Sequence, residues 1–176
     1  MNKIKYVSLF FRLLFQIIFV CMLCMQVIGW VYAPIDSWFN VIPRVYQDNI
    51  AYKLDLNTKI AGFVVTMIPT MIKLMVLYFL IKLFGLYERL EFFSANNVRY
   101  IRNAGYALLL EQIIRPFSDF ILGFILTSGN PPGFRYATMI ITGTNLGLML
   151  TALVIILISW IMTEGAKLHD EQQLTI

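Results

Sequence analysis

The stretch Ala104–Ser128, AGYALLLEQIIRPFSDFILGFILTS, is long and apolar enough to cross a bilayer, yet it carries three ionisable residues near its middle. Glu111, Arg115 and Asp119 are spaced by four residues, so a helix places them along one face. An ionisable group at bilayer depth costs about 2.5–3.5 kcal/mol on insertion scales. We therefore expect compensating groups elsewhere in the chain.

The composition of the whole chain is that of a membrane protein. Of its 176 residues, 59% are hydrophobic and 14% are charged, whereas soluble domains carry about 25% charged residues. The apolar residues gather in blocks of about 18 or more, the length that crosses a bilayer. We predict one all-α domain over residues 1–176, a membrane bundle of four transmembrane helices with short loops. The predicted spans are residues 9–32, 60–84, 104–128 and 137–163.

The first apolar block resembles a secretory signal, but we expect it to remain as a span. Its apolar part, Leu13–Val31, is longer than the roughly 7–15 residues of a signal peptide. Trp30 and Tyr32 would then lie at the outer membrane interface, where amphipathic aromatic rings gather.

Lysine and arginine are unevenly distributed between the two sides of this topology, and cytoplasmic loops carry the excess in membrane proteins. One side would hold Lys3, Lys5, Arg12, Lys82, Arg89, Arg99, Arg102 and Lys167. The other side would hold only Arg44, Lys53, Lys59 and Arg135. Both termini are therefore expected in the cytoplasm.

The second predicted span supplies a counter-charge for the third. Counted from the cytoplasmic ends of the two spans, Lys73 comes within about 3 Å of the levels of Glu111 and Arg115. With Asp119 included, the formal charges sum to zero. Asn145 in the fourth span falls near the level of Asp119 and is expected to hydrogen-bond it. We predict a neutral intramembrane cluster of Lys73, Glu111, Arg115, Asp119 and Asn145, with Gln16 and Gln26 as weaker candidates.

Two helix-kinking prolines, Pro69 and Pro116, fall at one level beside this cluster. Each removes a backbone hydrogen bond and frees the carbonyl four residues earlier, which is that of Val65 for Pro69. Thr66 and Thr70 lie on the side of Pro69. Freed carbonyls beside charged groups can line a polar cavity.

The cluster admits two interpretations. Intramembrane ionisable groups are candidates for binding an ion, a proton or a small polar ligand. Alternatively, the charges cancel and hold the helices together. The cancellation favours the structural interpretation, and a transporter is expected to be larger or to show an internal repeat, which this chain lacks.

Small residues recur every fourth position in the last span, at Gly143, Gly147 and Thr151. Such spacing lets helices approach closely. We expect this face to pack inside the monomer, with a homodimer face as the alternative.

Signatures of enzymes, metal sites and nucleic-acid binding are absent from the sequence. Cys21 and Cys24 form a CxxC inside an apolar helix, which we interpret as small hydrophobic residues. No second cysteine pair completes a metal set, and His169 stands alone in the tail. The chain contains no GxSxG, HExxH, P-loop or dinucleotide-binding pattern, and no basic stripe. No enzyme, cofactor, metal or direct nucleic-acid contact is expected.

Two short motifs carry a family resemblance. Asn97, Val98, Ile101, Arg102 and Gly105 match a pattern that leads into the third span, and Gly165, Leu168, Glu171, Leu174 and Thr175 match a closing pattern. The chain resembles a family of small four-span bacterial membrane proteins of unknown function, the DUF family numbered 2975. The resemblance implies a bacterial cytoplasmic membrane location and, through a neighbouring helix-turn-helix regulator, a regulatory or sensing role.

Taken together, these patterns favour an accessory or regulatory membrane protein that acts through protein contacts. The expected contact surfaces are the inner loop, residues 87–103, and the tail. The alternative is a small-solute or proton-coupled transporter that uses the charged cluster.

The topology makes a direct prediction for cysteine labelling. A cysteine introduced by Glu91→Cys should react with a membrane-impermeant thiol reagent only when the cytoplasmic side is exposed, because that loop is predicted inside. Asp48→Cys should react from the outside, and its labelling from the cytoplasm would overturn the topology. Wild-type protein, with Cys21 and Cys24 inside a span, is the background control.

Overall fold

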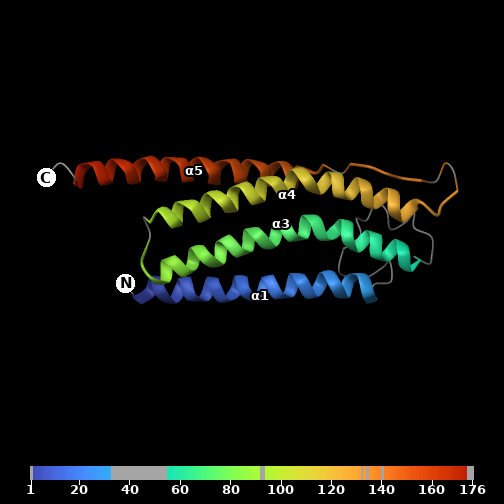
Figure 1. Ribbon diagram of the computed structural model, residues 1–176, viewed down its shortest axis with the longest axis horizontal. Helices are drawn as coiled ribbons and strands as arrows, with labels where there is room; N and C mark the ends of the chain where they lie inside the picture. Colours follow the sequence, from blue (N-terminus) through green and yellow to red (C-terminus); the bar gives the residue numbers. More distant parts are fainter. Residues whose placement is uncertain are drawn as a thin grey trace.

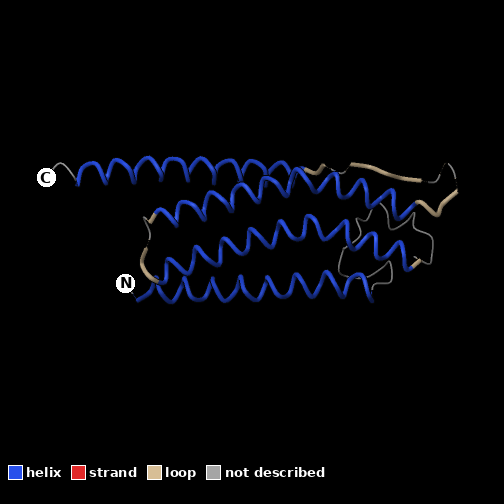
Figure 2. The backbone as a smooth tube through the Cα atoms, viewed as in Figure 1, coloured by secondary structure: helices blue, strands red, loops and turns tan. Residues whose placement is uncertain are grey.

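The computed structural model describes residues 2–32, 55–91, 94–131, 133, 135–139 and 141–173, with side chains of the last helix described as far as residue 165. These residues form the helices α1 (Asn2–Tyr32), α3 (Leu56–Glu88), α4 (Ala95–Thr127) and α5 (Gly143–Gln173). No strand occurs among them, which confirms the all-α prediction (Figure 2). The predicted first loop, residues 33–59, lies outside the described residues as far as residue 54, and α3 already begins within it at Leu56.

The helices form an open row in chain order rather than a closed bundle (Figure 1). α1 packs on α3, α3 on α4, and α4 on α5, and the described parts of α1 and α5 do not touch. Both termini lie at the end of the row that also holds the connection from α3 to α4. Among the described residues, each outer helix therefore rests on one neighbour and leaves a broad face uncovered.

Three stretches among the described residues are long and apolar enough to cross a membrane: Lys3–Val31, Leu56–Glu88 and Gly143–Gly165. α4 is not among them, because it carries the three charges near its middle. Large apolar side chains such as Phe10, Val64 and Leu150 are exposed on the helix surfaces. Such surfaces are stable against lipid and unfavourable against water.

The contact between α1 and α3 is built on a tryptophan and a glycine. Trp30 is buried, and its indole ring lies where a Cβ atom on Gly62 would be. Its indole N–H donates to Thr66 Oγ1 at 3.0 Å. Trp30, which the sequence predicts to lie at the outer membrane interface, packs its ring into a helix contact, because Gly62 leaves room for it.

The contact between α4 and α5 also centres on a glycine. A Cβ atom on Gly105 would lie 2.8 Å from Ile156 Cγ1, and Ala152 of α5 is fully buried there. Gly143 and Gly147 have no atom within 4 Å of a Cβ position. The expected packing of Gly143, Gly147 and Thr151 inside the monomer is therefore not found, because α5 turns Ala152 and Ile156 toward α4 instead.

The connection from α3 to α4 is held by local hydrogen bonds. Ser94 caps α4 by accepting from the Asn97 backbone N–H at 3.2 Å, as expected for the start of a helix. The Asn97 side chain is fully buried and donates to the Glu91 carbonyl at 3.4 Å. Asn97, part of the sequence pattern noted above, thus fixes the turn between two helices.

The last helix begins at Gly143, later than the predicted start at residue 137. The segment before α5 is instead tied to the end of α4, because the buried Thr127 hydroxyl contacts both the backbone N–H and the carbonyl of Tyr136, each at 3.1 Å. Thr142 instead caps α5 by accepting from the Asn145 backbone N–H.

We predict that Gly62→Ala destabilises the protein by about 1–3 kcal/mol, the usual cost of overpacking. The added methyl group would collide with the Trp30 ring, which is itself hydrogen-bonded. Thermal or denaturant unfolding in detergent measures the change. Gly147→Ala is the matched control in an open helical position, and it should be neutral or stabilising. Equal losses in the two variants would contradict this packing.

Candidate intramembrane polar site

A buried carboxylate joins α3 to α4. Glu111 Oε1 lies 3.4 Å from Lys73 Nζ of α3 and 3.5 Å from Arg115 Nη1, one turn further along α4. Its second oxygen, Oε2, accepts a hydrogen bond from the side-chain amide of Gln112. The Glu111 side chain is only 1% exposed. Two cations on adjacent helices therefore share one carboxylate that water does not reach.

The two cations differ from the carboxylate in their surroundings. The side chains of Lys73 and Arg115 are 38% and 46% exposed, and both line a cavity. Glu111 Oε1 accepts no hydrogen bond from a described group, although both cations lie within ion-pair distance. The contact is thus mainly electrostatic, and an unpaired carboxylate at this position would be costly.

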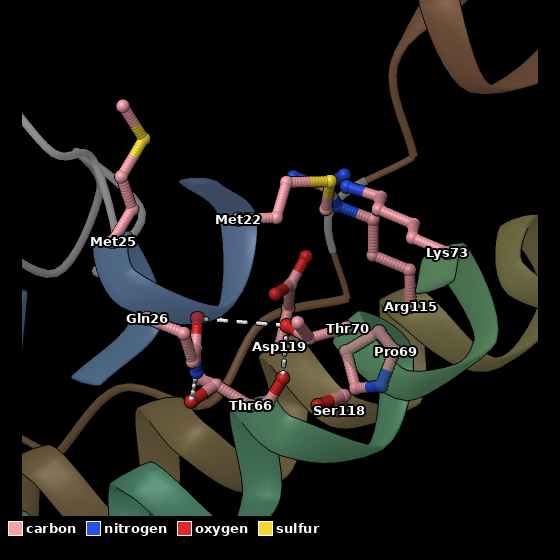
Figure 3. A pocket seen from close by; sticks show the side chains of 10 residues that line it. All are labelled: Met22, Met25, Gln26, Thr66, Pro69, Thr70, Lys73, Arg115, Ser118 and Asp119. Carbon is pink, nitrogen blue, oxygen red and sulfur yellow. Dashed lines mark hydrogen bonds between the residues drawn. The ribbon is translucent and has the colours of Figure 1, made fainter. Parts of the chain in front are cut away.

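The cavity beside this contact lies between α1, α3 and α4 (Figure 3). Its volume is about 230 Å³. Asp119 lines it together with the two cations, and in Figure 3 the Asp119 carboxylate is drawn between them and the polar groups of α1 and α3. Asp119 forms no salt bridge with any residue that the structure describes. The full lining is Met22, Met25, Gln26, Thr66, Pro69, Thr70, Lys73, Arg115, Ser118 and Asp119.

A polar network from α1 forms the opposite wall. Gln26 Nε2 donates to Thr66 Oγ1 at 2.7 Å, and Gln26 Oε1 accepts from Thr70 Oγ1 at 3.5 Å. The Thr66 hydroxyl donates to the Gly62 carbonyl of its own helix, and the single Thr70 hydroxyl proton is shared between Gln26 and the Thr66 carbonyl, which is nearer at 2.8 Å. Gln26 thus has a larger role than sequence reasoning gave it. The sequence feature that could have indicated this role is a glutamine in an apolar helix, together with two threonines on the same side of the next helix as Pro69.

The kink at Pro69 is satisfied by the neighbouring helix. Pro69 leaves the Val65 carbonyl without its helical donor. Ser118 Oγ of α4 donates to that carbonyl at 2.9 Å. Ser118 is buried and lies two residues after Pro116, the proline inside α4. The two prolines therefore lie next to the same hydrogen bond between helices, and Ser118 is a residue of the site that the sequence pattern did not indicate.

Asn145 lies apart from this site. It is in the first turn of α5, where its side-chain oxygen accepts from Thr142 Oγ1. It does not line the cavity and forms no hydrogen bond with Asp119 within the described chain. The expectation that it would pair with Asp119 was wrong, because α5 starts only two residues before Asn145 and uses that side chain at its own N-terminus.

The thiols and carboxylates of the described residues do not gather around a metal position. No group of three or more His, Cys, Asp or Glu side chains occurs among them. Cys21 and Cys24 are exposed free thiols on α1. The chemistry of the site is therefore that of one buried ion contact beside a small polar cavity.

Comparison with known proteins identifies a family. Residues 5–176 match the sequence model of a family described as a protein of unknown function (DUF2975). No curated protein matches the chain. No solved structure matches it either.

We predict that Ser118→Ala lowers stability by about 1–3 kcal/mol, because the Val65 carbonyl would lose its donor in an apolar setting. In a Pro69→Ala background the loss should shrink, since residue 69 then supplies a backbone N–H to the same carbonyl. Unfolding of the four proteins of this double-mutant cycle measures the coupling. Ser128→Ala, which removes an exposed hydroxyl at the end of α4, is the control. Full additivity in the cycle would refute the pairing.

Proposed function

Because the chain belongs to the DUF2975 family, whose function is unknown, we propose a role from its geometry. The protein is a multi-pass membrane protein that acts as an accessory or regulatory protein through contacts with other proteins. The observation that supports this proposal is the ion contact at Glu111, which uses charges of the membrane interior to hold two helices together.

The ion contact gives the charges of Glu111, Lys73 and Arg115 a structural role. Glu111 is buried between α3 and α4, and it would be costly there without Lys73 and Arg115. A carboxylate that carries a proton or a solute through a membrane needs access to water in at least one state. Glu111 is only 1% exposed in this structure, which supports a role in fixing the position of α4 against α3.

The open row of helices favours protein contacts. α1 and α5 each pack on one neighbour, so their outer faces are free for lipid, for a partner helix or for a second copy of the chain. The exposed face at Gly143, Gly147 and Thr151 supports a helix partner or a homodimer. The described residues of the inner loop (87–103) and of the tail (165–173) lie at one end of the row. They support a partner in the aqueous phase, such as a helix-turn-helix regulator.

We also propose that α4 crosses the membrane, as the third of four spans. Its 33 residues extend roughly 50 Å. It packs along α3 and α5, both apolar enough to cross a membrane, so it shares their depth. With the excess of Lys and Arg at the end that holds both termini, the proposed location is the bacterial cytoplasmic membrane with both termini inside.

A second candidate function, small-solute or proton-coupled transport, is favoured by one observation. Asp119 lines the cavity and forms no salt bridge with a described residue. The cavity also holds two half-exposed cations and the Gln26 network. Its volume of about 230 Å³ lies below the roughly 300–1,000 Å³ of ordinary ligand pockets. Only an ion or a very small solute would fit.

A double-mutant cycle separates the two functions. Glu111→Gln and Arg115→Gln should each destabilise the protein by about 1–3 kcal/mol, because each removes one partner of the ion contact. The double variant should regain part of the loss, with a coupling of about 1 kcal/mol or more. Unfolding in detergent and a growth phenotype are the measurements. Glu91→Gln with Arg99→Gln removes one charge of each sign outside the cluster and should be additive.

Asp119→Asn tests the alternative directly. The accessory function predicts normal folding and an unchanged phenotype, because Asp119 holds no ion pair in the described structure. Folded Asp119→Asn protein that has lost a proton-dependent uptake in proteoliposomes would establish transport and end the accessory proposal.

A further inference from the structure

A second cavity lies near the end of the row that holds both termini. It is lined by Arg12, Gln16, Tyr78, Ile81, Lys82, Gly85, Leu86, Arg89 and Tyr100. The residues come from α1, α3 and α4, except Arg89, which caps the C-terminus of α3. Its volume is about 460 Å³, within the range of ordinary ligand pockets.

The charge of this cavity is strongly positive. Arg12, Lys82 and Arg89 line it, and no acidic residue does. Glu88 neutralises only Arg12, through an ion pair of 2.8 Å. Lys82 and Arg89 form no ion pair with the residues that the structure describes, so two positive charges remain uncompensated.

The polar groups between these cations suit a tetrahedral oxyanion. Arg89 offers several N–H donors to one anion, and Lys82 a point charge. Lys82 Nζ lies 5.5 Å from the centre of the Tyr78 ring, which holds the ammonium at the cavity wall. The Tyr100 hydroxyl and the Gln16 amide are further donors in the lining.

Apolar residues share the same walls. Ile81 and Leu86 line the cavity. Phe11, Phe15 and Phe84, each next in sequence to a lining residue, form a cluster of rings with centroid distances of 5.3–6.1 Å. Basic pockets between membrane helices on the cytoplasmic side bind anionic headgroups. We propose that this cavity binds a phosphate group, supplied by the headgroup of an anionic phospholipid whose acyl chains lie along α1 and α3.

The test is lipid binding by the full chain in detergent, measured by native mass spectrometry. Wild-type protein should bind phosphatidylglycerol more tightly than phosphatidylcholine. The double variant Lys82→Gln/Arg89→Gln should lose phosphatidylglycerol affinity by about 25-fold, since each basic side chain near an anionic surface contributes a factor of about five. Arg12 is left intact so that Glu88 keeps its partner.

Two further proteins control this experiment. Lys59→Gln/Arg135→Gln removes the same charge at the opposite end of the row and should bind like wild type. Gly85→Phe keeps every charge, and a side chain there starts in open space, so it should occupy the cavity and lose binding while the protein stays folded. Far-UV circular dichroism of each variant checks the fold.

Inorganic phosphate distinguishes the source of the anion. If phosphate at millimolar concentration stabilises wild type and not Lys82→Gln/Arg89→Gln, while phosphatidylglycerol binds no better than phosphatidylcholine, the site takes a soluble phosphate and the lipid source is overturned. Equal phosphatidylglycerol affinity in wild type, Lys82→Gln/Arg89→Gln and Gly85→Phe would overturn the site itself.

Discussion

The position of α4 depends on one buried carboxylate. Without Lys73 and Arg115, Glu111 would carry an uncompensated charge in a place that water does not reach, and α4 would be a poor partner for two apolar helices. The ion contact removes that cost by engaging one cation from α3 and one from α4 itself. The same contact fixes the register of the two helices, because ion-pair distances permit little sliding.

Around this contact, the central helices satisfy their polar groups in pairs. The Val65 carbonyl, freed by Pro69, accepts a hydrogen bond from the Ser118 hydroxyl. The Thr66 hydroxyl oxygen accepts hydrogen bonds from the Gln26 amide and the Trp30 indole. Hydrogen bonds of this kind are worth about 0.6–2 kcal/mol each in a membrane interior. Their sum holds α1, α3 and α4 around a polar cavity, while α5 packs on α4 mainly through small and apolar side chains.

Both cavities lie between apolar helices and are lined by a few charged side chains, but they differ in net charge. The cavity beside Glu111 is lined by Asp119, Lys73 and Arg115, and the formal charges of these three residues and Glu111 sum to zero. The cavity near the termini keeps the surplus of Lys82 and Arg89. A balanced site stabilises a helix contact, whereas a site with surplus charge at a membrane surface attracts a counter-ion.

The sequence by itself determined the helical class and the apolar composition that is typical of a membrane protein. It also placed Lys73 at the level of Glu111 and Arg115, where the ion contact is found. Helical periodicity and a rise of about 1.5 Å per residue suffice to compare depths on neighbouring spans. Only the tertiary structure decided how each helix is rotated and where it ends. The rotations and ends of the helices place Gly105, rather than Gly147, in a helix contact. They also put Asn145 at the N-terminus of α5, and bring the Ser118 hydroxyl to the Val65 carbonyl. Rotation and helix ends follow from side-chain fit between helices, which a single sequence does not encode locally.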